Sequence, residues 1–488
     1  MQQTIKQLAT RGLAPLMAAL LLSACAAPAF KQPAIDLPAA FKEKQAEVKT
    51  AADGSQWKTA QPAEQQPRGE WWLVFSDPAL NELEGEAGRN NASLAVAAAR
   101  VKQARAIAGI AEADRIPHVG VGVGAQRSRT PVTSPVPQTS YQAQLTASYE
   151  VDLFGRVASG VAAARGDAAS VEANYRSVLL ALQADVAQAY FRLRATDAEL
   201  ATLEQTVRLR EEDVTVNQRR FDHGDIGEFD LSRAKTELAT AHAEAIGLQR
   251  QRSSTEHALA VLLGKPAAAF TAGANPLPDS ATMPAIPAGL PSSLLERRPD
   301  IAAAQRAMEA SNARIGVARA AMFPALNLSA SGGGVAGTFA DVFTLSGRSW
   351  MLGALLSAPL IDGGRNRANV TRSEAVLEES VATYRQSVLV AFAEVEDNLA
   401  GLRILAAQGE QVDDAVRAAR RSAELAQKLY DAGRTSYLEL LDAKRNLAAV
   451  ERNAVQLRGS RAATTVALIR ALGGGWDAAG SAGALAGR

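Results

Sequence analysis

The sequence predicts a mixed α and β membrane protein, built as a tandem repeat, in which a few strands accompany very long helices. Three observations support this fold class. The segment "YQAQLTASYEV" at 141–151 alternates strictly between apolar and polar residues, as a strand with two different faces does. Elsewhere Ala, Leu, Glu, Arg and Gln dominate, and no proline occurs between Pro137 and Pro266 or after Pro359. Finally, similar segments recur at a fixed offset.

The N-terminus is predicted to be a targeting segment, with residues 1–24 as a lipoprotein signal peptide. Lys6 and Arg11 precede an apolar run that is shorter than the ~20 residues of a membrane-spanning helix. The run ends in "LSAC" and resembles a bacterial lipobox, which implies that Cys25, the single cysteine, becomes the lipidated first residue. In bacterial lipoproteins, Ala26 after that cysteine favours the outer membrane. A plain cleavable signal with an incidental Cys25 is the alternative.

Two copies of one plan follow each other at an offset of 209 residues. Tyr175 corresponds to Tyr384, because 384 − 175 = 209, and Lys235 corresponds to Lys444 at the same offset. We therefore predict a first repeat at 71–266 and a second at 292–476. The remaining predicted segments are an N-terminal extension at 25–70, a linker at 267–291 and a C-terminal tail at 477–488.

Each repeat is predicted to begin with two strands, at 117–127 and 139–152 in the first copy and at 324–332 and 349–360 in the second. One face of these strands is apolar, with Tyr141, Tyr149 and Trp350 near strand ends, and the other carries mainly Gln, Thr, Ser and Asn. The segments between paired strands, 127–139 and 333–347, are rich in turn-forming residues and are predicted to be loops.

A long helical hairpin is predicted after each strand pair, at 157–264 and 363–472. Each hairpin turns once, where Gly224 and Gly433 stand at a position that favours a left-handed residue.

Four strands are too few to form a closed barrel, because known bacterial outer-membrane barrels start at about eight strands. A sheet that is apolar on one side and polar on the other is suited to lipid outside and water inside. The sequence therefore predicts that several copies of the chain share one barrel. An ordinary β-hairpin lying on a helical core is the alternative.

Several longer motifs resemble those of the outer-membrane factors of bacterial tripartite efflux pumps, the TolC-like channels. More narrowly, they resemble the lipid-anchored NodT-type branch that serves resistance-nodulation-division pumps. The motifs are "WWLVFSDPALNEL" from Trp71, "NNASLAVAAARVKQARA" from Asn90, "RRPDIAAAQRAMEASNARIGVARAAMFPAL" from Arg297, "AGRTSYLELLDAKRNL" from Ala432 and "ALGGGW" ending at Trp476.

The resemblance implies a homotrimer with a twelve-stranded transmembrane β-barrel, four strands from each protomer, continuous with a long periplasmic α-helical barrel. It implies a passive, gated exit duct for drugs or other small toxic solutes, with a periplasmic adaptor, an inner-membrane pump and outer-membrane lipid as partners. The expected location is the outer membrane of a Gram-negative bacterium, with a lipid anchor. Two alternatives remain: the outer-membrane factor of a type I secretion system, and a periplasmic adaptor lipoprotein.

The sequence offers no support for catalysis, a cofactor, a metal site or nucleic-acid binding. Its net charge is +1, and its four histidines are scattered without Cys or His neighbours at ligand spacing. The run "GGGVAG" from Gly332 matches a dinucleotide-binding pattern, but it opens no clear helix and lies in a predicted external loop.

The functional residues are predicted at the hairpin turns. In the family, these tips contact the adaptor; the matching residues are Gly224, Asp225, Ile226, Gly227, Gly433, Arg434, Thr435 and Ser436. The resemblance further implies a closed aperture lined by Leu438, Glu439, Asp442 and Asp230. Leu438, Glu439 and Asp442 are three or four residues apart and share one helix face. The repeat places Arg233 where the second copy has Asp442, and we hypothesise that Arg233 or Arg434 pairs with Asp442 or Glu439 of an adjacent hairpin.

Overall fold

The computed structural model describes residues 30, 41–43, 70–130, 134–278, 283–284, 286 and 297–474. The predicted signal peptide at 1–24, the lipidation site Cys25 and the tail at 477–488 lie outside the described residues. Most of the predicted extension at 25–70 and ten of the 25 residues of the linker at 267–291 also lie outside them.

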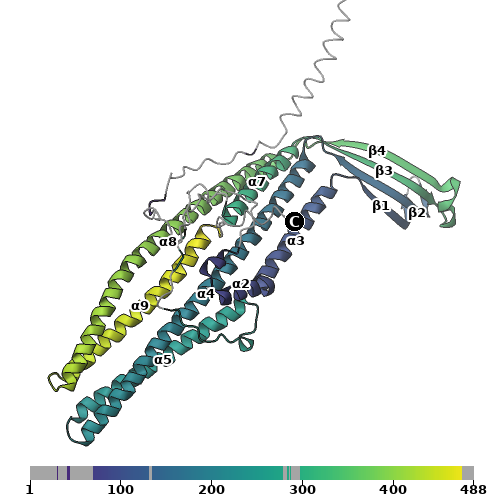
Figure 1. Ribbon diagram of the computed structural model, residues 1–488. Coiled ribbons are helices and arrows are strands. Elements are labelled where there is room, and N and C mark those ends of the chain that lie inside the picture. Colours follow the sequence, from purple (N-terminus) through teal and green to yellow (C-terminus); the bar gives the residue numbers. More distant parts are fainter. Residues whose placement is uncertain are drawn as a thin grey trace, which may run out of the picture. The chain divides into compact units, whose positions relative to one another are not determined.

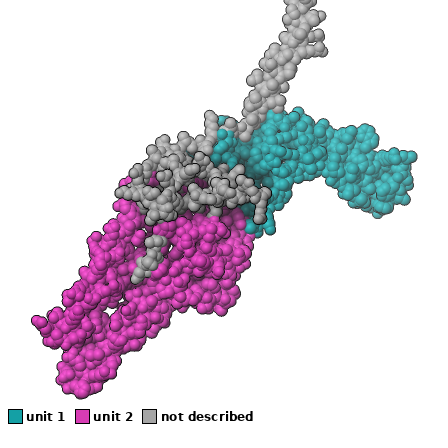
Figure 2. Space-filling model, viewed as in Figure 1, with its two compact units in different colours: residues 1–35, 98–174, 300–387 teal, residues 36–97, 175–299, 388–488 magenta. Residues whose placement is uncertain are grey.

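The chain forms two compact units, which are described separately below (Figure 2). Of the described residues, the first contains those within 1–35, 98–174 and 300–387, and the second contains those within 36–97, 175–299 and 388–488.

The first unit contains a four-stranded antiparallel sheet in the order β1-β2-β3-β4 (Figure 1). The strands are β1 (His118–Thr130), β2 (Ser134–Val151), β3 (Ala325–Ala336) and β4 (Arg348–Ser357). Their register aligns the apolar positions of all four strands: Val121 pairs with Leu145, Leu145 with Gly332, and Gly332 with Trp350. The sheet therefore has one continuous apolar face, and Val121, Leu145 and Trp350 are exposed on it.

The strands extend further into the two predicted loops than expected. β1 continues to Thr130 and β2 begins at Ser134, so most of 127–139 is strand rather than loop. Proline is tolerated there because β2 pairs with β3 only from Tyr141 onward, which leaves one edge of its first residues without a neighbouring strand. The second predicted loop holds the end of β3 and two short 3₁₀ turns, η3 (Ala340–Phe343) and η4 (Leu345–Gly347).

Two helical hairpins contribute most of the chain's length. They are α4 (Arg156–Asp222) with α5 (Glu228–Leu262), and α8 (Arg365–Asp431) with α9 (Tyr437–Ala471). Helices α4 and α8 each have 67 residues, about 100 Å at 1.5 Å per residue. Every bound of the second hairpin lies 209 residues after the first: 365 − 156, 431 − 222, 437 − 228 and 471 − 262 all equal 209.

Shorter elements pack beside these hairpins. They are η1 (Trp71–Phe75), α2 (Pro78–Asn90), α3 (Ala92–Ala113), η2 (Ala267–Ala269) and α7 (Pro299–Ala320). In the second unit, Trp71 and Trp72 lie in a core with Phe191 of α4 and Leu468 of α9. The mixed α and β class predicted from the sequence is confirmed. Among the described helices, none combines the length and the apolar character that a membrane crossing requires.

Candidate functional site: the tips of the helical hairpins

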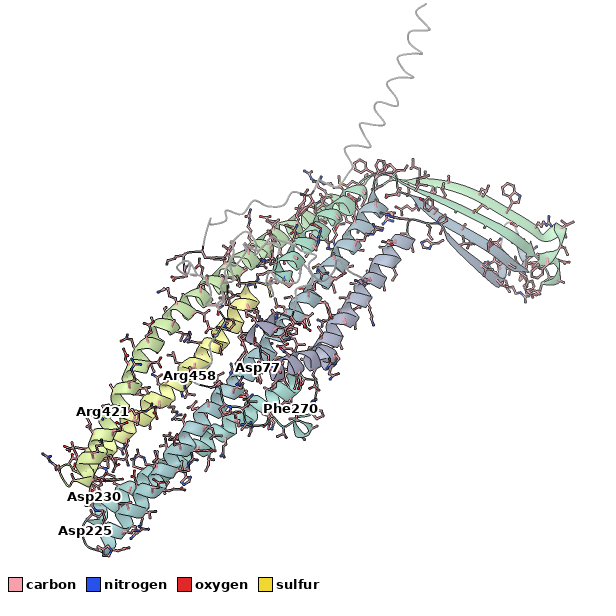
Figure 3. All side chains as sticks on the ribbon, in the orientation of Figure 1. Asp77, Asp225, Asp230, Phe270, Arg421 and Arg458 are labelled. Atoms are coloured by element: carbon pink, nitrogen blue, oxygen red, sulfur yellow. The ribbon has the colours of Figure 1, made fainter. Side chains whose placement is uncertain are left out.

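Both hairpins turn through a left-handed glycine. Gly224 has φ +80° and Gly433 has φ +69°. After them, the amide of Asp225 donates to the carbonyl of Arg220 at 2.8 Å, and the amide of Arg434 donates to the carbonyl of Leu429 at 2.8 Å. These bonds satisfy carbonyl groups at the ends of α4 and α8. Asp225 and Asp230 lie at the turn between α4 and α5 (Figure 3).

The second turn has a side-chain cap that the first lacks. The hydroxyl of Ser436 accepts a hydrogen bond from the amide of Glu439 at 3.3 Å, whereas Gly227 precedes α5 without a side-chain cap.

The eight predicted tip residues are Gly224, Asp225, Ile226, Gly227, Gly433, Arg434, Thr435 and Ser436. They occupy the two turns, and all are exposed except the half-buried Ile226 and Thr435.

The first turns of α9 have one buried and one exposed face. Tyr437, Leu440 and Leu441 are buried and pack with Ala234 of α5, so the two hairpins of one chain contact each other at their tips. Leu438 and Glu439 are exposed, and the Asp442 side chain is 61% exposed. The three predicted aperture residues of α9 therefore point away from the contact between the hairpins.

The predicted aperture residues of α5 have different surroundings. Asp230 is half-buried in the first turn of α5. Arg233 is also half-buried, and its guanidinium lies 5.4 Å from the centre of the Phe229 ring. Asp442 instead has Arg445, three residues further along α9, within 3.6 Å. The hypothesised pairing of Arg233 or Arg434 with Asp442 or Glu439 remains a prediction for the contact with another hairpin.

A hydrogen bond connects the ends of α4 and α8. Nη1 of Arg220 donates to the hydroxyl of Tyr430 at 2.5 Å, and the same guanidinium lies 5.2 Å from the centre of the ring. The ring centres of Tyr430 and Tyr437 are 5.9 Å apart. Burial raises the pKa of Tyr430, and burial raises that of Tyr437 to about 12, so both hydroxyls stay protonated at neutral pH.

Ion pairs continue from the tip along the contact between the hairpins. Arg445 donates to both carboxylate oxygens of Glu237, with Nε 3.0 Å from Oε2. Seven residues further along α9, Arg452 donates to Glu199 at 2.5 Å and to Glu244 at 3.0 Å. Lys444 pairs with Asp213 at 2.7 Å. We call these three groups of pairs the ion-pair ladder.

The ladder borders a cavity of about 200 Å³ between α4, α5 and α9. Its charged lining residues come from both hairpins: Glu199, Arg210, Glu237, Glu244, Arg445 and Arg452. Because these acids and bases pair with one another, the cavity presents no single sign of charge. In the part of the chain that the structure describes, no cluster of three potential metal ligands occurs.

Sequence reasoning did not identify the residues that hold the two tips together. Arg220, Tyr430 and the ladder were missed, although the spacing of the ladder gave a signal. Glu237 and Glu244 are seven residues apart, and so are Arg445 and Arg452. Opposite charges repeated at heptad spacing on two helices are typical of paired helices in coiled coils.

Long paired helices with charged tips, combined with a sheet that exposes one apolar face, are typical of a bacterial outer-membrane export channel. The family described as "Outer membrane efflux protein" matches residues 83–265 and 290–474. A toluene efflux pump outer membrane protein of Pseudomonas putida, TtgI, is 34% identical over 473 residues, 95% of this chain and 98% of that one.

A second relative and a solved structure are also similar to this chain over most of its length. The cation efflux system protein CusC of Escherichia coli is 32% identical over 470 residues, covering 95% of this chain and 99% of that one. The solved structure of the outer-membrane channel OprN has a TM-score of 0.81 and 30% identity, and the match covers 91% of this chain and 99% of that one.

The chain belongs to the outer membrane efflux protein family, which confirms the resemblance found in its motifs. Its function is that of the outer-membrane channel of a tripartite efflux pump, located in the outer membrane of a Gram-negative bacterium and extending into the periplasm. The relatives are named as efflux components, which favours efflux over type I secretion or an adaptor role.

Proposed function

We propose that three copies of the chain share one twelve-stranded β-barrel, with their helical hairpins forming a helical barrel in the periplasm. The observation that carries this proposal is the sheet itself. Its apolar face is exposed, and β1 and β4 each have one edge without a strand partner among the described residues. From Tyr141 to Val151 the apolar face is about 33 Å long along the strand. At a tilt of about 40°, this length matches an apolar band about 25 Å tall.

The assembled channel is a passive duct for drugs or other small toxic solutes. An inner-membrane pump of the resistance-nodulation-division type supplies the energy, and this chain supplies the gated exit without catalysing a reaction or holding a cofactor. TtgI is named for toluene and CusC for cations, so the family serves chemically different solutes. This range is consistent with a duct whose solute is selected by the pump.

The proposed domains follow the tandem plan, with repeats at 71–266 and 292–476 joined by the linker at 267–291. Cys25 carries the lipid anchor at the start of the extension at 25–70, and 477–488 form the tail. The periplasmic adaptor binds the two turns, 224–227 and 433–436, that follow α4 and α8. Their exposure supports this proposal.

The aperture is proposed at the exposed face of the first turns of α9. Under three-fold symmetry, Leu438, Glu439 and Asp442 form stacked rings of apolar and acidic side chains, with Asp230 nearby. Rings of carboxylates attract cations and repel anions. Arg233 of one subunit is proposed to pair with Asp442 or Glu439 of the next and so to hold the tips together.

Single-channel recording in a planar bilayer tests the aperture. Replacing Asp442 with Ala should raise the closed-state leak and lower the preference for cations, and Arg233→Ala should also raise the leak. The matched control is Asp414→Ala, because Asp414 on α8 is 62% exposed and, like Asp442, pairs with an arginine three residues later, Arg417. An Asp442→Ala channel that leaks no more than the Asp414→Ala channel would remove the aperture from this position.

A further inference from the structure

The segment between β3 and β4, residues 337–347, is a compact, internally bonded loop. The hydroxyl of Thr338 donates to the carboxylate of Asp341 at 2.7 Å, and the hydroxyl of Thr344 donates to the carbonyl of Asp341 at 2.7 Å. The side chain of Val342, in η3, is only 3% exposed. We call residues 337–347 the outer loop.

The outer loop lies on the apolar face of the sheet. Gly334 shares the face of Leu328 and Ala330, because residues two apart along a strand point the same way. A Cβ atom on Gly334 would lie 1.7 Å from the carbonyl oxygen of Val342, so η3 lies directly over Gly334 on that face. Tyr141 of β2, also on the apolar face, contacts Phe339 with ring centres 6.2 Å apart.

The loop presents large apolar side chains outward. Phe343 is 73% exposed, Leu345 is 75% exposed, and the rings of Phe339 and Phe343 are 5.8 Å apart. Trp350, at the same end of β4, is 77% exposed. Exposing such side chains to water is unfavourable, and here they continue the apolar face of the strands.

The charged residues at this end of the sheet's apolar face are of the kind found where a protein meets the polar surface of a membrane. Arg127 and Arg348 belong to the apolar face by register, since Arg127 pairs with Thr139 and Arg348 with Gly334. Both are exposed. The nearest acid of the loop, Asp341, accepts the bond from Thr338 described above. Aromatic and arginine side chains at the border of an apolar band are typical of a membrane interface.

We propose that the outer loop is a membrane anchor: it inserts Phe339, Phe343 and Leu345 among the acyl chains of the outer leaflet, while Arg127 and Arg348 contact anionic headgroups. The inference rests on the proposed barrel, whose lipid-facing side it extends. It differs from the expectation that 333–347 is a loop outside the membrane. A neighbouring subunit would join at the edges β1 and β4, so the exposed side of the loop and the uncovered part of the apolar face stay available to lipid.

Cysteine variants of the full lipoprotein, labelled with a bimane fluorophore and reconstituted in phosphatidylcholine–phosphatidylglycerol vesicles, test the proposal. The reporter is Phe343→Cys, with Leu345→Cys as a second variant if the first does not assemble. Val121→Cys on the apolar face of β1 is the reference for lipid. Gln142→Cys is the reference for water, because Gln142 is next to Tyr141 but on the opposite, polar face.

We expect brominated acyl chains to quench the fluorescence of the label at position 343 at least twofold more than that of the label at position 142. We expect aqueous iodide to quench the label at position 142 at least twofold more than the label at position 343. If label at 121 is quenched by lipid but label at 343 only by iodide, the loop proposal is overturned and the barrel stands. Protection at 343 from both quenchers means that protein covers the loop, and this too overturns it. If label at 121 also escapes lipid quenching, the barrel itself is wrong.

Discussion

Glu84 of α2 is a buried carboxyl group. Its side chain is 2% exposed, and neither carboxylate oxygen has a hydrogen-bond partner among the described residues. Burial raises the pKa of Glu84 to about 9, so the group is protonated at neutral pH in the folded protein. Since the unfolded chain ionises near pH 4.5, unfolding at neutral pH releases this proton.

Replacing Glu84 with Gln should therefore stabilise the protein in a pH-dependent way. The contribution of Glu84 is fully present below pH 4.5 and is lost as pH rises toward 9, by at most about 1.4 kcal/mol per pH unit. Gln cannot ionise, so the thermal unfolding midpoint of Glu84→Gln should exceed that of the parent increasingly from pH 5 to pH 9. Exposed Glu82 on the same helix provides the control, Glu82→Gln. A pH-independent difference would show that Glu84 is ionised in the folded protein.

The two tyrosines at the tip should respond differently to loss of the hydroxyl. Tyr430→Phe removes an acceptor from Arg220 and should cost about 1.5–3 kcal/mol, because the donor is charged. The hydroxyl of Tyr437 is buried without a hydrogen-bond partner among the described residues, so Tyr437→Phe should be neutral or stabilising. Thermal midpoints of the two purified variants measure the difference. Equal losses would mean that the Arg220 bond contributes little.

At the scale of elements, the ion-pair ladder breaks the symmetry of the repeat. Glu237 and Glu244 correspond to Asn446 and Asn453 at the 209-residue offset, and Arg445 and Arg452 correspond to Thr236 and Ala243. The backbone plan recurs, but these charges do not. The contact between α5 and α9 within one chain is therefore ionic, while the equivalent contact with a neighbouring chain would have neutral residues at these positions.

Arg445→Ala should loosen the contact between the hairpins. The hydrogen bond from Arg445 is the main cause of the lowered pKa of Glu237, whose side chain is only 14% exposed. Because Arg445 is 45% exposed and solvent screens it, we expect a loss of about 1 kcal/mol. The closed-state leak should rise, and the double swap Glu237→Arg with Arg445→Glu should restore it in part. A swap that leaks as much as Arg445→Ala alone would show that the pair itself does not hold the hairpins.

The sequence predicted whether a segment is a helix or a strand better than it predicted where each element ends or which other elements it contacts. Periodicity and absent prolines identify a strand at 141–151 and very long helices, because both depend on local side-chain pattern. The extension of β2 back to Ser134 was missed, since prolines exclude a strand only where both edges are paired, and pairing is a tertiary property. The fold of the outer loop onto the sheet depends on close approach at Gly334, which no local pattern reveals.

For the site, the glycines of both turns were found because a left-handed residue has a local sequence signature. The exposed face of α9 follows from helical spacing. The bond between Arg220 and Tyr430, and the pair of Arg445 with Glu237, could not be predicted in the same way. They depend on which faces of two hairpins, about 210 residues apart, meet.

For the whole molecule, the two edges of the sheet that are unpaired among the described residues determine how copies of the chain can assemble. Closure of a barrel pairs every edge, and antiparallel pairing between subunits is possible because each chain contributes an even number of strands. β1 and β4 are antiparallel in the four-stranded order, so β4 of one copy can continue onto β1 of the next. Three copies then give twelve strands with no free edge.

Disulfide cross-linking between those edges tests the trimer directly. Gly122→Cys in β1 is combined in turn with Met351→Cys, Gly353→Cys or Leu355→Cys in β4, all on the polar face. Three partners are used because each possible register between subunits brings a different β4 residue opposite Gly122. Cα atoms of facing strands are close enough for a disulfide, so one combination should give covalent dimers and trimers after oxidation. Gly122→Cys with Gln144→Cys, which pair within one chain, should cross-link without a gain in mass. If all three edge combinations remain monomeric while this control oxidises, β4 does not meet β1 of another copy and the shared barrel is refuted.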